Sequence, residues 1–475
     1  MLNLTDSEKR DIVQYIEEGK ELPEKYRFLL FENKRQVELL WNGKSDEITN
    51  VVLPFQTIEC VDEPRSEEHK KLQEDLFDFS GRQIKGWTNK LIWGDNKYIL
   101  SSLKNGPMRQ EIEEQGGIKL IYIDPPFDVG ADFSMDIEIG DGESFNKKPN
   151  VLEELAYRDT WGMGQDSFLS MIYERLVLMK DLLSDDGSIY VHCDWRVNSG
   201  IRIILDEIFG KDNFQNELIW VYKEREISKK RFNRKHETIF FYTKSNNYPF
   251  NFDSIRESYS PITIKKFKYE DEKGKFRIRH KDGRSDIPIS EESDQTYRQY
   301  LNESGGPLAR DWFEFPFLNQ ASSERIGYPT QKSEVLVEKF VKASSNEGDL
   351  VCDFFVGSGT TSSVCEKLNR KWICSDLGKF SIHTTRKRII SVQRQLKKDG
   401  KDYRAFEILN LGKYQTQHFL SEGKNERDER KKVSESKREK EFIKLILNAY
   451  DSEPVNGFNT FDGKKSSRFV SIGPI

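Results

Sequence analysis

The stretch "KLIYIDPPFDVGAD", Lys119 to Asp132, contains a short apolar run followed abruptly by an acid, two prolines and an aromatic ring. Leu120 to Ile123 have the β-branched and large side chains of a buried strand. Proline cannot donate to a sheet ladder, so the strand is expected to end at Asp124. The sequence therefore places a carboxylate and an aromatic side chain on a stiff corner at the end of a buried strand.

Outward from this stretch, apolar segments of strand length alternate with segments of helical periodicity. Strands are expected at 90–94, 184–195, 216–223, 237–245, 349–355 and 371–377, and helices at 97–105, 167–183, 197–210, 333–344 and 360–369. Strands that alternate with helices predict an α/β fold, with a doubly wound, mostly parallel sheet covered on both faces. Residues 245 to about 325 are expected to be irregular, basic and rich in aromatic residues.

Composition limits the class of protein. The 475 residues have a mean hydropathy of -0.73 with 33% charged residues, and no apolar run is long enough to cross a bilayer, so no membrane partner is expected. Five cysteines without a CxxC pair argue against a disulfide framework and a zinc site, and predict a cytoplasmic location without a metal. The net charge of -5 gives no global sign of a nucleic-acid partner.

Two local segments depart from this acidic average. Residues 223–235, "KEREISKKRFNRK", carry seven basic against two acidic residues, and residues 265–284 carry nine against four, so each has a net charge of +5. One such run is usually a solvated loop surface, but two in one region favour a phosphate-binding face. The candidate contacts are Lys229, Lys230, Arg231, Arg234, Lys265 and Lys266.

A second motif, "DLVCDFFVGSGTTSSVCEKL", joins a buried strand to a helix through a glycine turn at Gly357 and Gly359. Glycines allow a ligand to approach the backbone closely, and the helix start offers free N–H groups. The next strand ends at Asp376, where an acid can accept hydrogen bonds from ribose hydroxyls. The alternative is a structural glycine turn with a surface aspartate, and the glycine pattern by itself is weak.

Together, "DPPF" and the later "DFFVGSGTT" resemble the DNA adenine-N6/cytosine-N4 methyltransferases, in the permuted order in which the catalytic motif comes first. "RIGYPTQKSEVLVEKFV" is similar to that family's HPTQKP segment, although Tyr328 and Ser333 depart from it. "IWGDN" and "HETIFFYTKS" also look like its recurrent strands. The resemblance covers roughly residues 90–388 and looks closest to the modification subunits of type III restriction systems.

This resemblance implies a Rossmann-like methyltransferase that uses S-adenosylmethionine. The catalytic residues would be Asp124, Pro125, Pro126 and Phe127. The cofactor-binding residues would be Asp95, Thr330, Lys332, Asp353, Phe355, Gly357, Gly359, Thr360 and Asp376. Asp95, Thr330 and Lys332 are assigned by resemblance only.

The chemistry explains the stiff corner. An exocyclic amino group is a poor nucleophile because its lone pair is delocalised into the base. The Asp124 carboxylate and the Pro125 carbonyl would accept its hydrogen bonds and meet the developing positive charge, with little reorganisation. Phe127 would stack on a base rotated out of the duplex.

The expected organisation has five parts. They are an N-terminal accessory module (1–85), a catalytic half (86–210), the remaining strands with an inserted basic target-recognition region (211–325), a cofactor-binding half (326–399) and a C-terminal appendage (400–475). The appendage is expected to lie outside the catalytic sheet, to contain a strand at 468–472 and to be cut by proteases between about residues 420 and 440.

The leading interpretation is adenine-N6 methylation of double-stranded DNA for restriction–modification. Cytosine-N4 methylation, more often associated with Ser before Pro-Pro, is the alternative. A DNA-binding specificity subunit without activity and a methyltransferase for RNA or protein are weaker ones. The resemblance implies a homodimer and a restriction subunit as further partners.

Overall fold

The computed structural model describes most of the chain between residues 38 and 411. The described residues are 9, 12, 13, 15, 38–45, 47–61, 86–126, 135–139, 143–147, 165–222, 229–282, 286–301, 305–315, 318, 322, 324–328, 330–411, 453–454, 463–465 and 468–470. The chain divides into two compact units, Met1–Leu40 and Trp41–Ile475. No described helix is long and apolar enough to span a membrane.

A ten-stranded mixed sheet forms the centre of the second unit, with the strand order β1-β15-β2-β14-β13-β3-β6-β8-β7-β12. These strands are β1 (Gln56–Val61), β2 (Asn89–Trp93), β3 (Ile118–Ile123), β6 (Leu183–Cys193), β7 (Phe214–Val221), β8 (His236–Thr243), β12 (Trp312–Glu314), β13 (Leu350–Asp353), β14 (Lys371–Asp376) and β15 (Phe406–Asn410). The six neighbouring strands from β15 to β6 are all parallel, whereas β8 is antiparallel to β6 and β7. The predicted mostly parallel sheet is confirmed.

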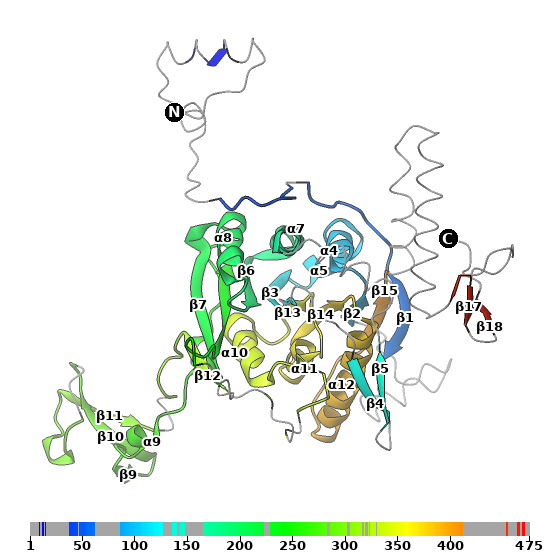
Figure 1. Ribbon diagram of the computed structural model, residues 1–475. Coiled ribbons are helices and arrows are strands. Elements are labelled where there is room, and N and C mark those ends of the chain that lie inside the picture. Colours follow the sequence, from blue (N-terminus) through cyan, green and yellow to red (C-terminus); the bar gives the residue numbers. More distant parts are fainter. Residues whose placement is uncertain are drawn as a thin grey trace. The chain divides into compact units, whose positions relative to one another are not determined.

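Helices cover both faces of this sheet (Figure 1). One group comprises α4 (Asn96–Asn105), α5 (Met108–Glu114), α7 (Gln165–Leu182) and α8 (Asn198–Phe209). The other comprises α10 (Glu334–Ser344), α11 (Thr360–Lys367) and α12 (Lys379–Lys398). This two-sided cover explains why the central strands are apolar on both faces.

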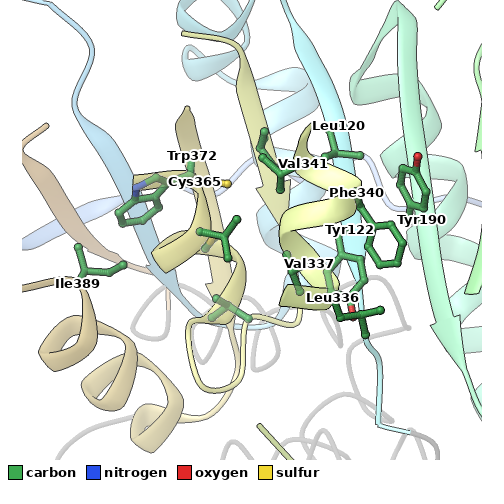
Figure 2. Close-up of a cluster of buried hydrophobic side chains, with 14 of the residues drawn as sticks. Leu120, Tyr122, Tyr190, Leu336, Val337, Phe340, Val341, Cys365, Trp372 and Ile389 are labelled. Carbon is green, nitrogen blue, oxygen red and sulfur yellow. The ribbon is translucent and has the colours of Figure 1, made fainter. Parts of the chain in front are cut away.

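Aromatic side chains fill the space between α10 and the sheet (Figure 2). Phe340 stacks on Tyr122 of β3 and on Tyr190 of β6, with ring centroids 5.7 and 4.7 Å apart. Tyr190 also stacks on Phe241 of β8 at 4.4 Å. Because side chains alternate along a strand, Asp124 and His192 leave the sheet on the same face as Tyr122 and Tyr190. The aromatic layer therefore supports the side chains at the sheet's edge.

The region from 245 to 325 is more ordered than the sequence indicates. It contains the short helices η2 (Phe252–Ile255), α9 (Pro261–Ile264) and η3 (Ile289–Glu291), and an antiparallel sheet of β9 (Tyr269–Asp271), β10 (Gly274–His280) and β11 (Thr296–Tyr300). Arg298 ties this small sheet together through ion pairs with Asp271 and Glu292. The remaining short elements are η1 (Lys211–Asn213), the hairpin β4 (Met135–Ile139) and β5 (Glu143–Lys147), and the sheet β16 (Glu453–Pro454), β17 (Gly463–Lys465) and β18 (Arg468–Val470).

Strand β15 corrects one expectation about the end of the chain. It lies between β1 and β2 in the main sheet, so the prediction that everything from Gly400 onward lies outside the sheet is wrong for Phe406–Asn410. Residues 47–61 also join this unit, since β1 pairs with β15 and Glu59 forms an ion pair with Arg386. The predicted protease site between residues 420 and 440 lies outside the described residues.

Candidate active site

The two sequence motifs leave the sheet side by side. Strands β3 and β13 are parallel neighbours, with Ile121 opposite Cys352, so both end at the same edge. Asp124 follows β3 at this edge, and the glycine turn follows β13. Ligand sites of open α/β sheets form at this carboxyl edge. The fold thus brings together two motifs that lie far apart in the sequence.

Asp124 and the prolines form a partly buried corner. Pro125 is buried and Pro126 is half-buried, while the Asp124 side chain keeps 16% of its surface exposed. Phe127, the predicted stacking residue, lies outside the described residues. One Asp124 oxygen, Oδ2, lies 3.2 Å from Nζ of Lys332. The structure therefore places Lys332, predicted as a cofactor ligand, against the predicted catalytic carboxylate.

Two further side chains continue this contact inward. Nζ of Lys332 lies 3.1 Å from Oε2 of Glu237 at the start of β8, and the same Glu237 oxygen lies 2.7 Å from Nε2 of His192. The other ring nitrogen of His192 is 3.0 Å from the Tyr122 hydroxyl. A ring with its proton on Nε2 would face the Glu237 carboxylate with a donor and leave Nδ1 to accept from the Tyr122 hydroxyl.

Sequence reasoning missed His192 and Glu237 as site residues. Only part of the signal was in the sequence, namely two polar residues near the ends of apolar strands. The fold adds the antiparallel pairing of β6 and β8, with Thr238 opposite Cys193. The end of one strand and the start of the next therefore meet at the edge where Asp124 lies. Polar residues at both places in otherwise apolar strands could have been assigned to the site.

The pKa values of Glu237 and Lys332 are both shifted in this group. Burial would raise the pKa of Glu237, but hydrogen bonding from His192 and the Lys332 charge outweigh it and lower the pKa to about 2. Burial likewise opposes the Lys332 ammonium, yet Asp124 and Glu237 outweigh it and raise the pKa of Lys332 above its ordinary value. Both groups are therefore charged at neutral pH.

The glycine turn is held by Asp376 at the end of β14. Its Oδ2 accepts a hydrogen bond from the Gly357 N–H at 2.9 Å, and its Oδ1 accepts one from the Gly378 N–H at 2.8 Å. Each carboxylate oxygen has a second lone pair, so Asp376 can still accept from ribose hydroxyls. The Thr360 hydroxyl donates to the Lys332 carbonyl at 3.1 Å and so joins the turn to the lysine's segment.

Asp353, the last residue of β13, is a buried acid beside this turn. It accepts hydrogen bonds from the Thr361 hydroxyl at 2.6 Å and the Phe355 N–H at 2.9 Å. Burial, with a smaller contribution from the negative charges of Asp124 and Asp376, raises its pKa to about 7 despite these bonds. Three carboxylates thus repel one another at one strand edge, a charge surplus that fits a cationic ligand such as the sulfonium of S-adenosylmethionine.

The substitution Asp353→Asn should change the pH dependence of stability. The folded pKa of about 7 lies above the ordinary 3.8, so the folded state holds an extra proton between these values. Stability of the wild type should therefore fall as pH rises through this window, by about 1.4 kcal/mol per unit. Asparagine resembles the protonated acid, so the variant should gain stability relative to wild type between pH 5 and pH 8.

Thermal unfolding of the cofactor-free protein at several pH values would measure this difference. The exposed Asp212→Asn is the matched control, and it should follow the wild-type curve. Parallel curves for wild type and Asp353→Asn would contradict the raised pKa of Asp353.

The remaining predicted cofactor residues lie at or near the same edge. Asp95 begins α4, where it accepts from the Lys97 N–H at 2.8 Å and pairs with Arg175 at 2.7 Å. Trp93, two residues earlier, lies opposite Asp376 in the parallel register of β2 and β14. Phe355 is half-buried, and Thr330 is exposed. Their roles in cofactor binding stay predictions.

The first basic run lies at the same edge of the sheet, beside β6 and β8, on the side of β3 away from the glycine turn. Lys229, Lys230 and Arg231 are exposed shortly before β8, and the Arg234 guanidinium lies 3.3 Å from the ring centroid of Trp195. Trp195 follows β6, two residues after its last residue, Cys193. The loops after β6 and before β8 therefore present cations and an exposed aromatic ring near Asp124.

In the second basic run, some charges are used inside the small sheet. Arg277 lies 3.2 Å from Asp286 and stacks on Phe267, whereas Lys265 is exposed. Lys266 is exposed and lies 3.7 Å from Asp286. Part of this run's positive charge is thus neutralised locally.

Comparisons with known proteins match the part of the chain that contains both motifs. The DNA methylase family of N6 and N4 methyltransferases matches residues 118–387, more than half of the chain. The type II methyltransferase M.EcaI of Enterobacter cloacae is 30% identical over 338 residues, which cover 63% of this chain and 69% of that protein. M.HpaI of Haemophilus parainfluenzae is 28% identical, covering 58% and 70%.

The likeness extends to type III systems. The EcoP15I Mod subunit of Escherichia coli is 28% identical over 225 residues, covering 45% of this chain and 31% of that protein. Relatives therefore include both type II methyltransferases and type III modification subunits. With Asp124 and the glycine turn inside the matched segment, the chain belongs to the N6/N4 DNA methylase family, whose members use S-adenosylmethionine.

Proposed function

We propose that the chain methylates the exocyclic N6 of an adenine that is rotated out of a specific DNA sequence. The observation that carries the proposal is the ionic Asp124 corner beside the glycine turn. A carboxylate at this position accepts from an amino group and meets its developing positive charge. Bound S-adenosylmethionine would supply the methyl group from its sulfonium.

Adenine is preferred over cytosine because of the residue before the two prolines. Asp124 stands where cytosine-N4 enzymes more often carry serine, so the chain resembles the adenine-specific members. Both bases present an amino group of the same chemistry, and the side chains described around Asp124 suit either. Cytosine-N4 methylation is therefore the second candidate.

Product analysis distinguishes these functions. The purified chain would be incubated with labelled S-adenosylmethionine and unmethylated double-stranded DNA, followed by digestion to nucleosides. We expect label in N6-methyladenine. Label in N4-methylcytosine would establish the second candidate, and DNA binding without transfer would establish a specificity subunit without activity.

A role in restriction–modification is part of the proposal. Its support is that type II methyltransferases and type III modification subunits are among the relatives. A restriction subunit, a homodimer and a cytoplasmic location stay predictions. Size measurement of the purified chain with and without DNA would test the dimer.

Neutralising the first basic run should weaken DNA binding in a salt-dependent way. The variant changes Lys229, Lys230, Arg231 and Arg234 to alanine, since their loop lies at the edge that carries Asp124. The slope of log affinity against log salt should fall by roughly one unit for each DNA phosphate that the variant no longer neutralises. Fluorescence titrations from low to moderate salt measure it.

The matched control changes Lys397, Lys398 and Lys401 to alanine. These exposed lysines lie at or just beyond the C-terminal end of α12, which starts after β14 at the edge that carries Asp124 and runs back towards the opposite edge. Their removal should leave the slope nearly unchanged. An unaltered slope in the Lys229–Arg234 variant would show the run to be ordinary solvated surface.

A further inference from the structure

A buried group of alternating charges lies directly behind the catalytic carboxylate. It consists of Asp124, Lys332, Glu237 and His192, joined by contacts of 3.2, 3.1 and 2.7 Å in that order. The side chains of the first three keep 16, 12 and 15% of their surface exposed, and His192 has none. We call these four residues the charge chain.

The charge chain comes from four separate elements on one face of the sheet. Asp124 follows β3, His192 is in β6, Glu237 is the second residue of β8, and Lys332 lies two residues before α10. The ring of Trp220, opposite Glu237 in the register of β7 and β8, lies 5.7 Å from Nζ of Lys332. The Thr360 hydroxyl, at the start of α11 just after the glycine turn, donates to the Lys332 carbonyl and fixes the backbone of this lysine.

The net charge of this group is informative. Two carboxylates and one ammonium leave one negative charge when the imidazole is neutral. Were Lys332 paired with Asp124 alone, the pair would be neutral and the carboxylate a weaker acceptor for a developing cation. Glu237 shares the ammonium, so Asp124 keeps negative charge to offer the target amino group.

We propose that Lys332 and Glu237 are positioning residues for Asp124. Lys332 lies 3.2 Å from Oδ2 of Asp124, and Oδ1 lies 3.9 Å from Nδ1 of His192, so the carboxylate is held in place for the incoming amino group. Glu237 shares the ammonium and so prevents the lysine from neutralising the acceptor. His192, held by Tyr122, fixes Glu237 in turn. This inference rests on the proposed function and assigns Lys332 to the reacting amino group, in contrast to the cofactor role that the sequence resemblance implies.

Three variants test the proposal: Lys332→Met, Glu237→Gln and their combination. At saturating DNA and S-adenosylmethionine, each single change should lower kcat by about 10- to 100-fold. Lys332→Met leaves the Asp124 and Glu237 carboxylates to repel each other, and Glu237→Gln leaves Asp124 neutralised by Lys332. The double variant has neither the repulsion nor the neutralisation. Its kcat should therefore be higher than the product of the two single losses predicts. The dissociation constant for S-adenosylmethionine should stay within about 3-fold of wild type.

The controls separate positioning from folding. Lys339→Met on α10, whose lysine lies over Phe313, and the exposed Glu217→Gln on β7 are matched changes outside the charge chain and should leave kcat unchanged. Lys332→Arg keeps the charge and should recover part of the activity. Loss of activity in Lys332→Met without such recovery, together with a lowered unfolding temperature, would show a structural role and overturn the proposal.

Two other outcomes also overturn it. A weakened cofactor affinity with an unchanged kcat in Lys332→Met would return this lysine to the cofactor pocket, and full activity in both single variants would show that neither residue matters. Asp124→Ala in the same assay separates failure of the proposed function from failure of the charge chain. An active Asp124→Ala contradicts the proposed function. An inactive Asp124→Ala together with an active Lys332→Met contradicts only the role of the charge chain.

Discussion

Asp124→Ala should lower methyl transfer to DNA by about 100- to 1,000-fold, while S-adenosylmethionine affinity changes only a few-fold. The amino group would lose its charged acceptor, and an acceptor preorganised in a partly buried corner contributes roughly 3–4 kcal/mol to the transition state. The Pro125 carbonyl alone cannot replace it. The glycine turn and Asp376 keep their own hydrogen bonds, so the cofactor side of the site stays intact.

The Asp124→Ala protein should fold because the substitution leaves no buried charge unpaired. Lys332 still has Glu237 at 3.1 Å after Asp124 is removed, so the buried ammonium stays paired. Asp124→Asn is the matched control: it keeps an acceptor oxygen without the charge and should retain more activity than alanine. Transfer of label to DNA gives kcat, and calorimetry gives the cofactor affinity. Near-normal turnover by Asp124→Ala would contradict the proposed role.

The sequence predicted the central sheet well because its signals are local. Apolar runs such as those of β3 and β13 end in proline or glycine, and the amphipathic segments between strands have clear helical spacing. Each expected strand and helix around the two motifs is present. Neighbouring placement of the motifs followed from the family resemblance, and the parallel register of β3 and β13 accounts for it.

Elements with weak local signals were not predicted. Strand β9 has three residues, none of them buried, and it is held by β10 and by the ion pair of Asp271 with Arg298. Strand β15 was assigned to the C-terminal appendage (400–475), although it pairs with β2. Both strands form because they pair with strands elsewhere in the chain, and an alternating pattern over a few residues does not predict such pairing.

The charge chain was hidden for a related reason. Lys332 and Glu237 were both inside quoted motifs, but a motif gives the residue type and not the direction of the side chain. Their meeting depends on the antiparallel return of β8 along β6 and on the Thr360 bond to the Lys332 backbone. These are tertiary facts that one sequence without its fold does not contain.

The two glycines of the cofactor motif have different surroundings. Both have positive φ, +51° at Gly357 and +78° at Gly359, where an L side chain costs about 1–2 kcal/mol. A Cβ at Gly357 would meet only the Tyr328 ring, at 3.5 Å. A Cβ at Gly359 would lie 2.8 Å from both Cγ2 and Oγ1 of Thr385, a fully buried residue of α12.

Gly359→Ala should therefore destabilise the protein and lower cofactor affinity by at least about 10-fold, with overpacking adding roughly 1–3 kcal/mol to the backbone cost. Gly357→Ala should lose only the free energy that an L side chain costs at positive φ. A decrease in S-adenosylmethionine affinity of this variant would therefore come from the new Cβ meeting the cofactor. Thermal unfolding and calorimetric titration of S-adenosylmethionine measure the two effects separately.

The decisive variant is Gly359→Ala combined with Thr385→Ala. The second change removes the two Thr385 atoms nearest the new Cβ, leaving its Cα at 3.1 Å, and it also removes the hydroxyl that donates to the Gly357 carbonyl. If the clash with α12 is the cause, the double variant should regain part of the unfolding temperature that Gly359→Ala loses. Thr385→Ala alone is the control and should be destabilising, because it deletes a buried methyl and a hydrogen bond. Without any recovery in the double variant, the requirement for glycine at 359 would lie in the left-handed backbone or in close approach of the cofactor, and packing against α12 would not explain it.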